Sequence, residues 1–400
     1  MKKTLAAVAV LGAFAGSALA ADVQLYGIVD LGVGYSHVDA DGLGKDSDSF
    51  GMKSGQASGS RWGIKGTEDL GNGLTVGFIL ENGFTADDGV DSEPMFNRES
   101  SLFIEGGFGK FAMGRIGSIN NGQSSWATVG MISAFGTSDW GGYSAQLSNV
   151  MSLAGQWDNM IAYQTPSFAG FKLYAQYSMG KKVTDEYTDE HFVDHEVSLG
   201  KENESSSDRY YAIGATYNNG PFAAYFAVDS MNYSSAYVTD NKGTIGYKDT
   251  DDSLTVTLGG SYDFEVVKVY LGAQYFDEVK ASTLGGVASD VFKFGSDDKA
   301  KGYGVTISAD APLWGGKGMF GFGYVDAEQA DSVEALYPGE TLDFKRYVVS
   351  VGYDYPFSKR TDVYAVASYM QDSIEEKDAT SSVDYDPSAY TFYVGLRHRF

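Results

Sequence analysis

Residues 346–360 are Arg-Tyr-Val-Val-Ser-Val-Gly-Tyr-Asp-Tyr-Pro-Phe-Ser-Lys-Arg. From Tyr347 to Tyr355 every second residue is Tyr or Val, and the intervening residues are Val, Ser, Gly and Asp. Alternation with a period of two over about ten residues is typical of a β-strand with one apolar face. A short Pro-containing turn, residues 356–360, follows at once. A strand joined to a short turn is therefore the unit from which we predict the fold.

The same alternation recurs along the chain, for example over residues 171–178, 254–262 and 267–276. A soluble β-sandwich has alternating strands too, so the lengths of the connections must decide between the two folds. Short links occur at 69–73, 106–109, 166–170, 218–221, 263–265, 312–318 and 356–360. Longer polar stretches occur at 38–57, 86–95, 118–157, 181–206, 234–251, 279–300, 329–342 and 374–387. Short turns alternating with long loops predict an all-β fold, a sixteen-stranded antiparallel transmembrane β-barrel.

The composition agrees with a barrel in a membrane. Within hydrocarbon every backbone polar group must be paired internally, so the sheet must close and its outward residues must be apolar. The chain has 28 Tyr, 24 Phe and 51 Gly but only 7 Pro, which suits long strands with aromatic girdles. The inward positions are too polar and too rich in Gly to form a solid core. A barrel of sixteen strands is wide enough to hold water.

The first twenty residues are predicted to be a cleaved signal peptide. Lys2 and Lys3 precede an apolar run, and Ala18-Leu19-Ala20 is a small-x-small cleavage site. The barrel domain is then residues 21–400, and loss of two lysines takes the formal charge from −24 to about −26. The strong acidity excludes nucleic acid as a partner, because a phosphate backbone needs a basic face. The chain has no cysteine, which excludes disulfide scaffolds.

The last strand carries a row of alternating residues that ends on an aromatic ring. Its members are Tyr390, Phe392, Val394, Leu396, His398 and Phe400. This row resembles the C-terminal signal that the bacterial barrel-assembly machinery recognises. The simpler explanation is a final strand that closes the barrel against the first, and the two roles are compatible.

Several segments resemble the trimeric, sixteen-stranded porins of Gram-negative bacteria. They are Val23–Asp30, Ser60–Leu74, Phe108–Arg115, Asn159–Pro166 and Gly395–Phe400. The resemblance covers the whole chain after residue 20. It implies a homotrimer without a cofactor, set in outer-membrane lipid and lipopolysaccharide, through which ions and small hydrophilic solutes diffuse passively. It also implies that the third outer loop folds inward and narrows the pore.

The composition of the third loop supports this position. Between Ser118 and Trp157 the only charged residue is Asp139, yet three of the five tryptophans lie here. A loop in external water has no need to be uncharged and aromatic, whereas one folded against the barrel wall does. The alternative is an outer loop that contacts a neighbouring subunit.

Charged residues at inward positions are the candidate pore constriction. Arg61 and Lys65 alternate with apolar Trp62 and Ile64, so we expect both to face the lumen. The resemblance implies that Arg61 and Arg115 belong to a basic wall. Simple alternation places Arg115 with outward residues, however, and a bulge would be needed to turn it inward.

Acidic residues are expected to oppose this basic wall. We expect Asp30 and Glu81 on the lumen face and Asp139 on the third loop. Alternation groups Arg98 with Leu102, which indicates a place at a rim. Many members of the resembling family have an arginine where this chain has Ala162. The wall is thus one charge short, and with the acidic loops this predicts a slight preference for cations.

No pattern indicates catalysis or a metal site. His191 and His195 flank Phe-Val-Asp without the glutamate of a zinc-protease helix, and the other two histidines, His37 and His398, stand alone. We therefore expect a general diffusion porin rather than an enzyme. Two alternatives stay open: a substrate-specific channel, and a surface adhesin or enzyme built on a barrel.

Overall fold

The computed structural model describes residues 22–181, 183–188, 194–200, 207–233, 236–239, 245–248, 251–286, 299–334, 341–377 and 380–400. The predicted signal peptide and His191 lie outside these residues. The signal peptide and its cleavage site therefore stay predictions.

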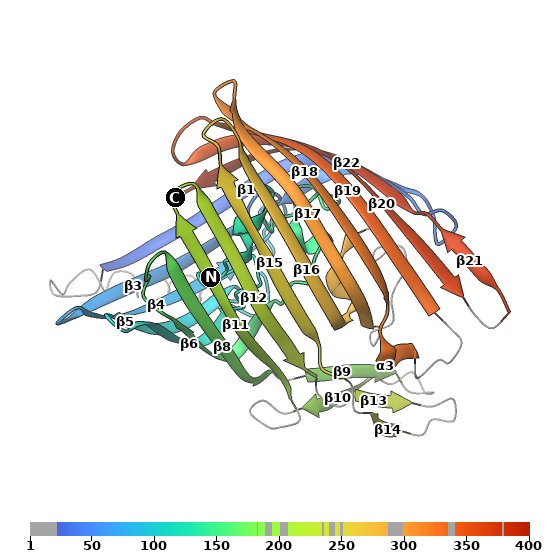
Figure 1. Ribbon diagram of the computed structural model, residues 1–400, viewed down its shortest axis with the longest axis horizontal. Coiled ribbons are helices and arrows are strands. Elements are labelled where there is room, and N and C mark those ends of the chain that lie inside the picture. Colours follow the sequence, from blue (N-terminus) through green and yellow to red (C-terminus); the bar gives the residue numbers. More distant parts are fainter. Residues whose placement is uncertain are drawn as a thin grey trace.

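The chain forms a closed antiparallel barrel of sixteen wall strands, as predicted (Figure 1). These are β1 (Asp22–Asp39), β3 (Arg61–Gly71), β4 (Leu74–Gly83), β5 (Glu99–Gly106), β6 (Gly109–Gly117), β7 (Gln156–Gln164), β8 (Phe171–Lys181), β11 (Asp208–Asn219), β12 (Phe222–Asn232), β15 (Leu254–Asp263), β16 (Lys268–Lys280), β17 (Lys299–Leu313), β18 (Gly316–Gln329), β19 (Thr341–Pro356), β20 (Thr361–Lys377) and β22 (Ser388–Arg399). Each wall strand pairs with the next along the chain, and β22 pairs with β1 from Ile28↔Arg399 to Asp39↔Ser388. The ring is closed, so no wall strand is left as an open edge.

Two short hairpins, a short helix and one further strand extend the barrel at the end with the long loops. Hairpins β9 (Val183–Thr188) with β10 (Asp194–Gly200) and β13 (Ala236–Thr239) with β14 (Ile245–Lys248) lie at the same end as the short helix α3 (Asp331–Glu334) (Figure 1). β21 (Ser382–Tyr385) pairs with the end of β20.

The seven predicted short turns all lie between consecutive wall strands. The predicted loop at 38–57 differs, because β2 (Ser47–Ser54) lies within it and pairs with β1 from Leu31 to Val38. Its alternation explains the pairing, since Phe50 and Met52 are exposed while the alternate positions, Ser49, Gly51 and Lys53, are small or polar. Residues 55–60 then leave the wall before β3 resumes it.

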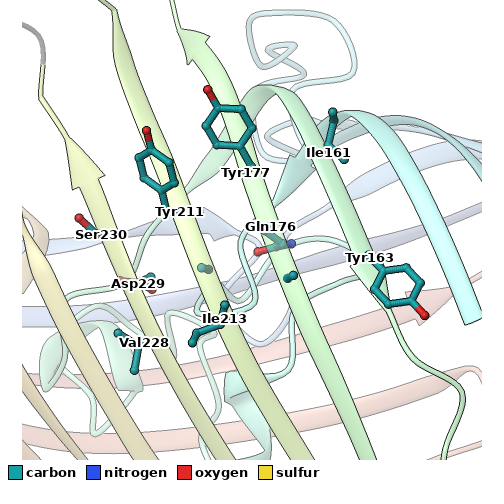
Figure 2. A pocket seen from close by; sticks show the side chains of 11 residues that line it. Ile161, Tyr163, Gln176, Tyr177, Tyr211, Ile213, Val228, Asp229 and Ser230 are labelled. Carbon is teal, nitrogen blue, oxygen red and sulfur yellow. The ribbon is translucent and has the colours of Figure 1, made fainter.

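The outward face is apolar along its length. Exposed side chains include Leu25, Leu102, Ile213, Leu258, Leu271, Ile307, Val351 and Leu396. Figure 2 shows part of this face, a groove of about 410 Å³ on β7, β8, β11 and β12 in which Tyr177 and Tyr211 lie on neighbouring strands. Their rings are 5.2 Å apart. Alternate positions, such as Gln176 and Asp229, belong to the buried inner row.

The row at the end of the chain faces outward as well. Tyr390, Phe392, Val394, Leu396 and Phe400 are all exposed. The backbone of Phe400 exchanges two hydrogen bonds with Gly27, and its ring lies over that glycine, where a methyl group would be only 2.3 Å away. This residue therefore takes part in closing the barrel, while its role as an assembly signal stays a prediction.

The third loop (residues 118–155) packs on glycines of the inner wall. Ile119, Ile132, Val150 and Met151 are fully buried. A methyl group added to the wall glycines would meet these side chains or the loop backbone at 3.1 Å or less: Gly214 on β11, Gly259 on β15, Gly272 on β16, Gly304 on β17 and Gly323 on β18. The glycines thus form a trough without side chains in the inner wall. Burial of each apolar loop side chain in this trough stabilises the folded state by roughly 1.5–3 kcal/mol.

Polar side chains of the inner wall bind the loop backbone between these glycines. Gln176 accepts the N–H of Ile119 at 2.8 Å, and Gln274 accepts the N–H of Ser152 at 2.7 Å. The hydroxyl oxygens of Ser308 and Ser350 accept the N–H groups of Ala134 and Ala145. The inward polar and glycine residues therefore receive the third loop rather than simply facing water, because a buried loop needs partners for its backbone.

Substitution of one trough glycine should weaken the barrel. In Gly304→Ala the new methyl group would lie 1.7 Å from the carbonyl oxygen of Val150, so the loop must shift. We expect a loss of about 1–3 kcal/mol, typical of overpacking. Gly51→Ala is the control, because nothing lies within 4 Å of a methyl group there. The temperature at which the folded band converts to the unfolded band on a gel measures the stability of both variants. Equal temperatures would contradict the packing of the third loop on these glycines.

Candidate functional site

A cavity of about 720 Å³ lies between the third loop and the wall formed by β1, β3, β4 and β5. The wall contributes the charged side chains Arg61, Lys65, Glu81, Arg98 and Glu99. The loop contributes amides and hydroxyls with one carboxylate: Asn121, Gln123, Ser124, Ser125, Thr137, Ser138, Asp139, Gln146 and Ser148. The site is thus asymmetric, with a densely charged wall opposite a polar loop.

Glu81 is the centre of the charged wall. Its carboxylate accepts the Nε of Arg98 at 2.7 Å and the hydroxyl of Tyr26 at 3.0 Å, and the Nε of Arg61 lies 3.5 Å away. The register explains this cluster, because Glu81 lies directly opposite Gly63, one inward position from Arg61. Two guanidinium groups therefore share one carboxylate.

Lys65 extends this basic row along β3. Its ammonium group lies over the ring of Tyr26, 5.1 Å from the centroid, which is within range for a cation–π interaction. Among the residues that the structure describes, it forms no ion pair. Lys65 is exposed and lines the cavity.

Asp139 is the only charge on the loop side of the cavity. It is exposed, and its carboxylate contacts the amides of Gln146 at 3.3 Å and Gln56 at 3.5 Å. Gln56 also accepts the backbone N–H groups of Trp140 and Gly141, through its carbonyl and side-chain oxygens respectively. Residues 55–60, which leave the wall between β2 and β3, thereby hold the loop at the position of Asp139.

Glu99 is a cavity residue that the sequence did not indicate. It is buried beside Glu81 in the β4–β5 register, and its carboxylate accepts the backbone N–H and the hydroxyl of Ser125, each at 2.8 Å. Glu99 therefore attaches the start of the third loop to the wall. Glu99 is three residues before outward Leu102, so the period of two in β5 places it on the inward face. The sequence alternation could therefore have identified it.

Arg98 was predicted at a rim, and the structure corrects this. It lines the cavity, where its Nη1 also donates to Gln123 of the third loop at 2.9 Å. Residue 98 precedes β5 and lies in a bend, so the alternation of the strand does not apply to it. Phe96 just before it has a φ of 61°, which indicates how sharply the chain turns here.

Arg115 lies away from the cavity, which corrects its predicted role in the constriction. In the ladder it pairs with Ser100, on the outward row of Leu102, and paired residues point to the same face. The β6–β7 ladder does have a bulge here, but the extra residue is in β7. Arg115 instead binds the carboxylate of Asp158 and the carbonyl of Asn97.

Asp30 is on the inner row of β1, as expected, but it does not reach the cavity. The side chain is 0% exposed, and its carboxylate accepts the N–H groups of Ala57 and Ser58 and the hydroxyl of Tyr364. It anchors residues 55–60 to the wall, which replaces the predicted role as a pore charge. Ala162 is also inward and fully buried, paired with Ala112 and Gln176 beneath the third loop.

Comparison with known proteins agrees with this geometry. The model of a family described as Gram-negative porin matches residues 6–375. The chain belongs to the Gram-negative porin family. It is therefore an outer-membrane channel, and the predicted family and location are confirmed.

This porin has full-length relatives among characterised proteins. It is 33% identical to an outer-membrane porin protein of Bordetella pertussis and 30% identical to outer-membrane porin protein 32 of Delftia acidovorans, over 100% of both chains in each case. Among solved structures it is similar to an anion-selective porin from Comamonas acidovorans, with a TM-score of 0.62 and 25% identity, covering 95% of this chain and 100% of the other.

The shared carboxylate gives a prediction for the wall. Glu81→Gln leaves Arg61 and Arg98 without their anionic partner, so the reversal potential in a salt gradient should shift toward anions. Glu105→Gln, an exposed position on β5 outside the cavity, is the control. An unchanged potential in Glu81→Gln would show that the two arginines do not face the permeating ions.

Proposed function

We propose that this protein is a general diffusion porin whose constriction is the cavity between β1, β3–β5 and the third loop. The single observation that supports this is the asymmetry of the cavity, with charged side chains on the wall and mainly amides and hydroxyls on the loop. Mixed charges and polar groups offer hydrogen bonds and electrostatic contacts to many small solutes without binding one of them tightly. The inward position of the third loop belongs to this proposal, on the basis of its hydrogen bonds to Gln176, Gln274, Ser308 and Ser350.

A planar-bilayer recording tests the proposal against its alternatives. A general porin gives stable ohmic conductance that small neutral and charged solutes do not block at low concentration. Saturable block by one class of solute would favour a substrate-specific channel. Absence of conductance from correctly folded protein would favour an adhesin or an enzyme.

We further propose that the constriction itself weakly prefers anions. Three cations and three acids line the cavity, but Glu81 and Glu99 are occupied by hydrogen bonds and ion pairs. Arg61 and Arg98 share the single carboxylate of Glu81, which leaves one positive charge in that cluster, and exposed Lys65 adds a second against exposed Asp139. The anion selectivity named for the Comamonas acidovorans relative supports this sign. The acidic outer loops favour cations at the pore mouth, as the sequence led us to expect, so the two regions oppose each other.

Ionic strength separates these two contributions. At about 1 M salt the Debye length is roughly 3 Å, which screens the loops, whereas at about 0.01 M it is roughly 30 Å. We expect anion preference at high salt and a shift toward cations at low salt. Cation preference at every salt concentration would overturn the proposal that the constriction itself prefers anions.

Substitutions identify which residues determine the ion selectivity of the constriction. Lys65→Ala and, more strongly, Arg61→Glu should move the reversal potential toward cations, and Asp139→Asn should move it toward anions. Lys317→Ala, exposed near a short turn, is the control and should have no effect. If Arg61→Glu leaves the potential unchanged, Arg61 does not belong to the constriction.

We also propose a homotrimer, with one subunit contact on the outward face of β5–β7. Arg115 and Asp158 form an ion pair on this face, beside Ser100. A charged pair facing hydrocarbon is costly, whereas a neighbouring protein subunit can cover it and complete its hydrogen bonds.

The trimer should resist sodium dodecyl sulfate and dissociate on boiling. Arg115→Ala should lower the temperature of dissociation, because Asp158 then loses its partner within the contact. Lys377→Ala, which removes exposed ion pairs with Glu375 and Asp343 at the end of β20, is the control. A monomer in mild detergent by cross-linking and light scattering would contradict the assembly, and an unaffected trimer in Arg115→Ala would contradict this contact.

A further inference from the structure

Arg346 on β19 is a buried arginine whose five N–H groups all have partners. The residue is 1% exposed and faces inward. Its Nε and Nη2 bind the two carboxylate oxygens of Asp372 on β20, at 2.6 and 2.8 Å. The remaining three N–H groups donate to backbone carbonyls of Asn149, Leu284 and Gly285. This is the bidentate geometry that makes an arginine contact specific in direction as well as strong.

The three carbonyls belong to two segments that are far apart in the sequence. Asn149 is in the third loop, whereas Leu284 and Gly285 belong to the outer segment, residues 281–286, which follows β16. The two segments also touch directly, because the hydroxyls of Ser152 and Thr283 are 2.8 Å apart. Arg346 thus joins the third loop, the outer segment and the wall at one point.

The position of this contact along the third loop is informative. The start of the loop is attached to the wall by Glu99, and its middle is held by Gln56 in the segment between β2 and β3. Arg346 holds the returning half at Asn149, next to Ser148, which lines the cavity. Arg346 itself does not line the cavity, so its charge has no direct contact with solutes.

We propose that Arg346 is a positioning residue that locks the third loop to the outer segment 281–286 and so sets the width of the constriction. The inference rests on the proposed channel function. The arginine acts through backbone carbonyls, so the geometry of its planar group matters as well as its charge. A change in the outer segment is transmitted to the pore through the same contact.

The first test removes the five-donor group. Arg346→Lys keeps the positive charge but cannot make all five hydrogen bonds. Arg346→Met removes both the charge and the hydrogen-bond donors. We expect a several-fold increase in open-channel current noise and closure at lower voltage, with Arg346→Met the stronger. Lys345→Met is the matched control, because the neighbouring side chain is exposed on the outward row of the same strand. Heat-modifiable mobility on a gel shows whether each barrel has folded.

The second test restores the lock by another bond. The chain has no cysteine, so Ser152→Cys with Thr283→Cys introduces a single possible disulfide between the third loop and the outer segment. Oxidation should return the noise and closing voltage of Arg346→Met to wild-type values, and reduction should abolish the rescue. In an otherwise wild-type chain, oxidation should raise the closing voltage, which tests the link even if Arg346→Met does not fold.

The outcomes distinguish this inference from the proposed function. If folded wild-type protein does not conduct, the channel function fails. If the wild type conducts and folded Arg346→Met has the same noise and closing voltage, Arg346 does not position the loop. A defect in Arg346→Met that the oxidised disulfide does not correct would also overturn the inference, because the residue would then act other than through this link.

Discussion

Closure of the backbone hydrogen-bond ladder is the constraint on which the rest of this structure depends. In hydrocarbon an unpaired N–H or C=O group costs several kcal/mol, so the wall strands must form a ring without an edge. The pairing of β22 with β1 over twelve register positions, together with the hydrogen bonds between Phe400 and Gly27, completes that ring. Once the ring exists, a period of two assigns every side chain either to lipid or to the interior.

The interior then poses a packing problem that a wide barrel cannot solve with wall side chains alone. Here the third loop packs against wall residues on several strands, and the wall is adapted to it. Glycines such as Gly272 and Gly304 leave space for Ile132, Met151 and the backbone at Val150, while Gln176 and Gln274 satisfy loop amides. The inward row is polar and small because it has to accept a second layer of backbone as well as water.

Electrostatics in the pore depends on which charges remain accessible after pairing. Asp30, Glu81 and Glu99 are all acids on inward positions, yet they bind loop amides, hydroxyls or guanidinium groups. Lys65 and Asp139 stay exposed to the cavity. A count of lumen charges from the sequence therefore overestimates the acids that a passing ion encounters, and the acidic formal charge of the whole chain does not fix the sign of selectivity.

The sequence alone determined the strand count, the seven short turns and the inward side of Arg61, Lys65 and Glu81, because alternation and turn composition are local properties of a membrane strand. It also indicated the unusual third loop through its lack of charge. Only the tertiary structure decided the places of Arg98 and Arg115. A bend before β5 takes Arg98 out of the alternation of that strand, whereas Arg115 follows the alternation of β6 to the outward face, against the inward position that the resemblance implied. The same holds for Arg346 and Asp30. Their partners are distant in sequence, and such contacts arise only when the closed ring brings separate strands and loops together.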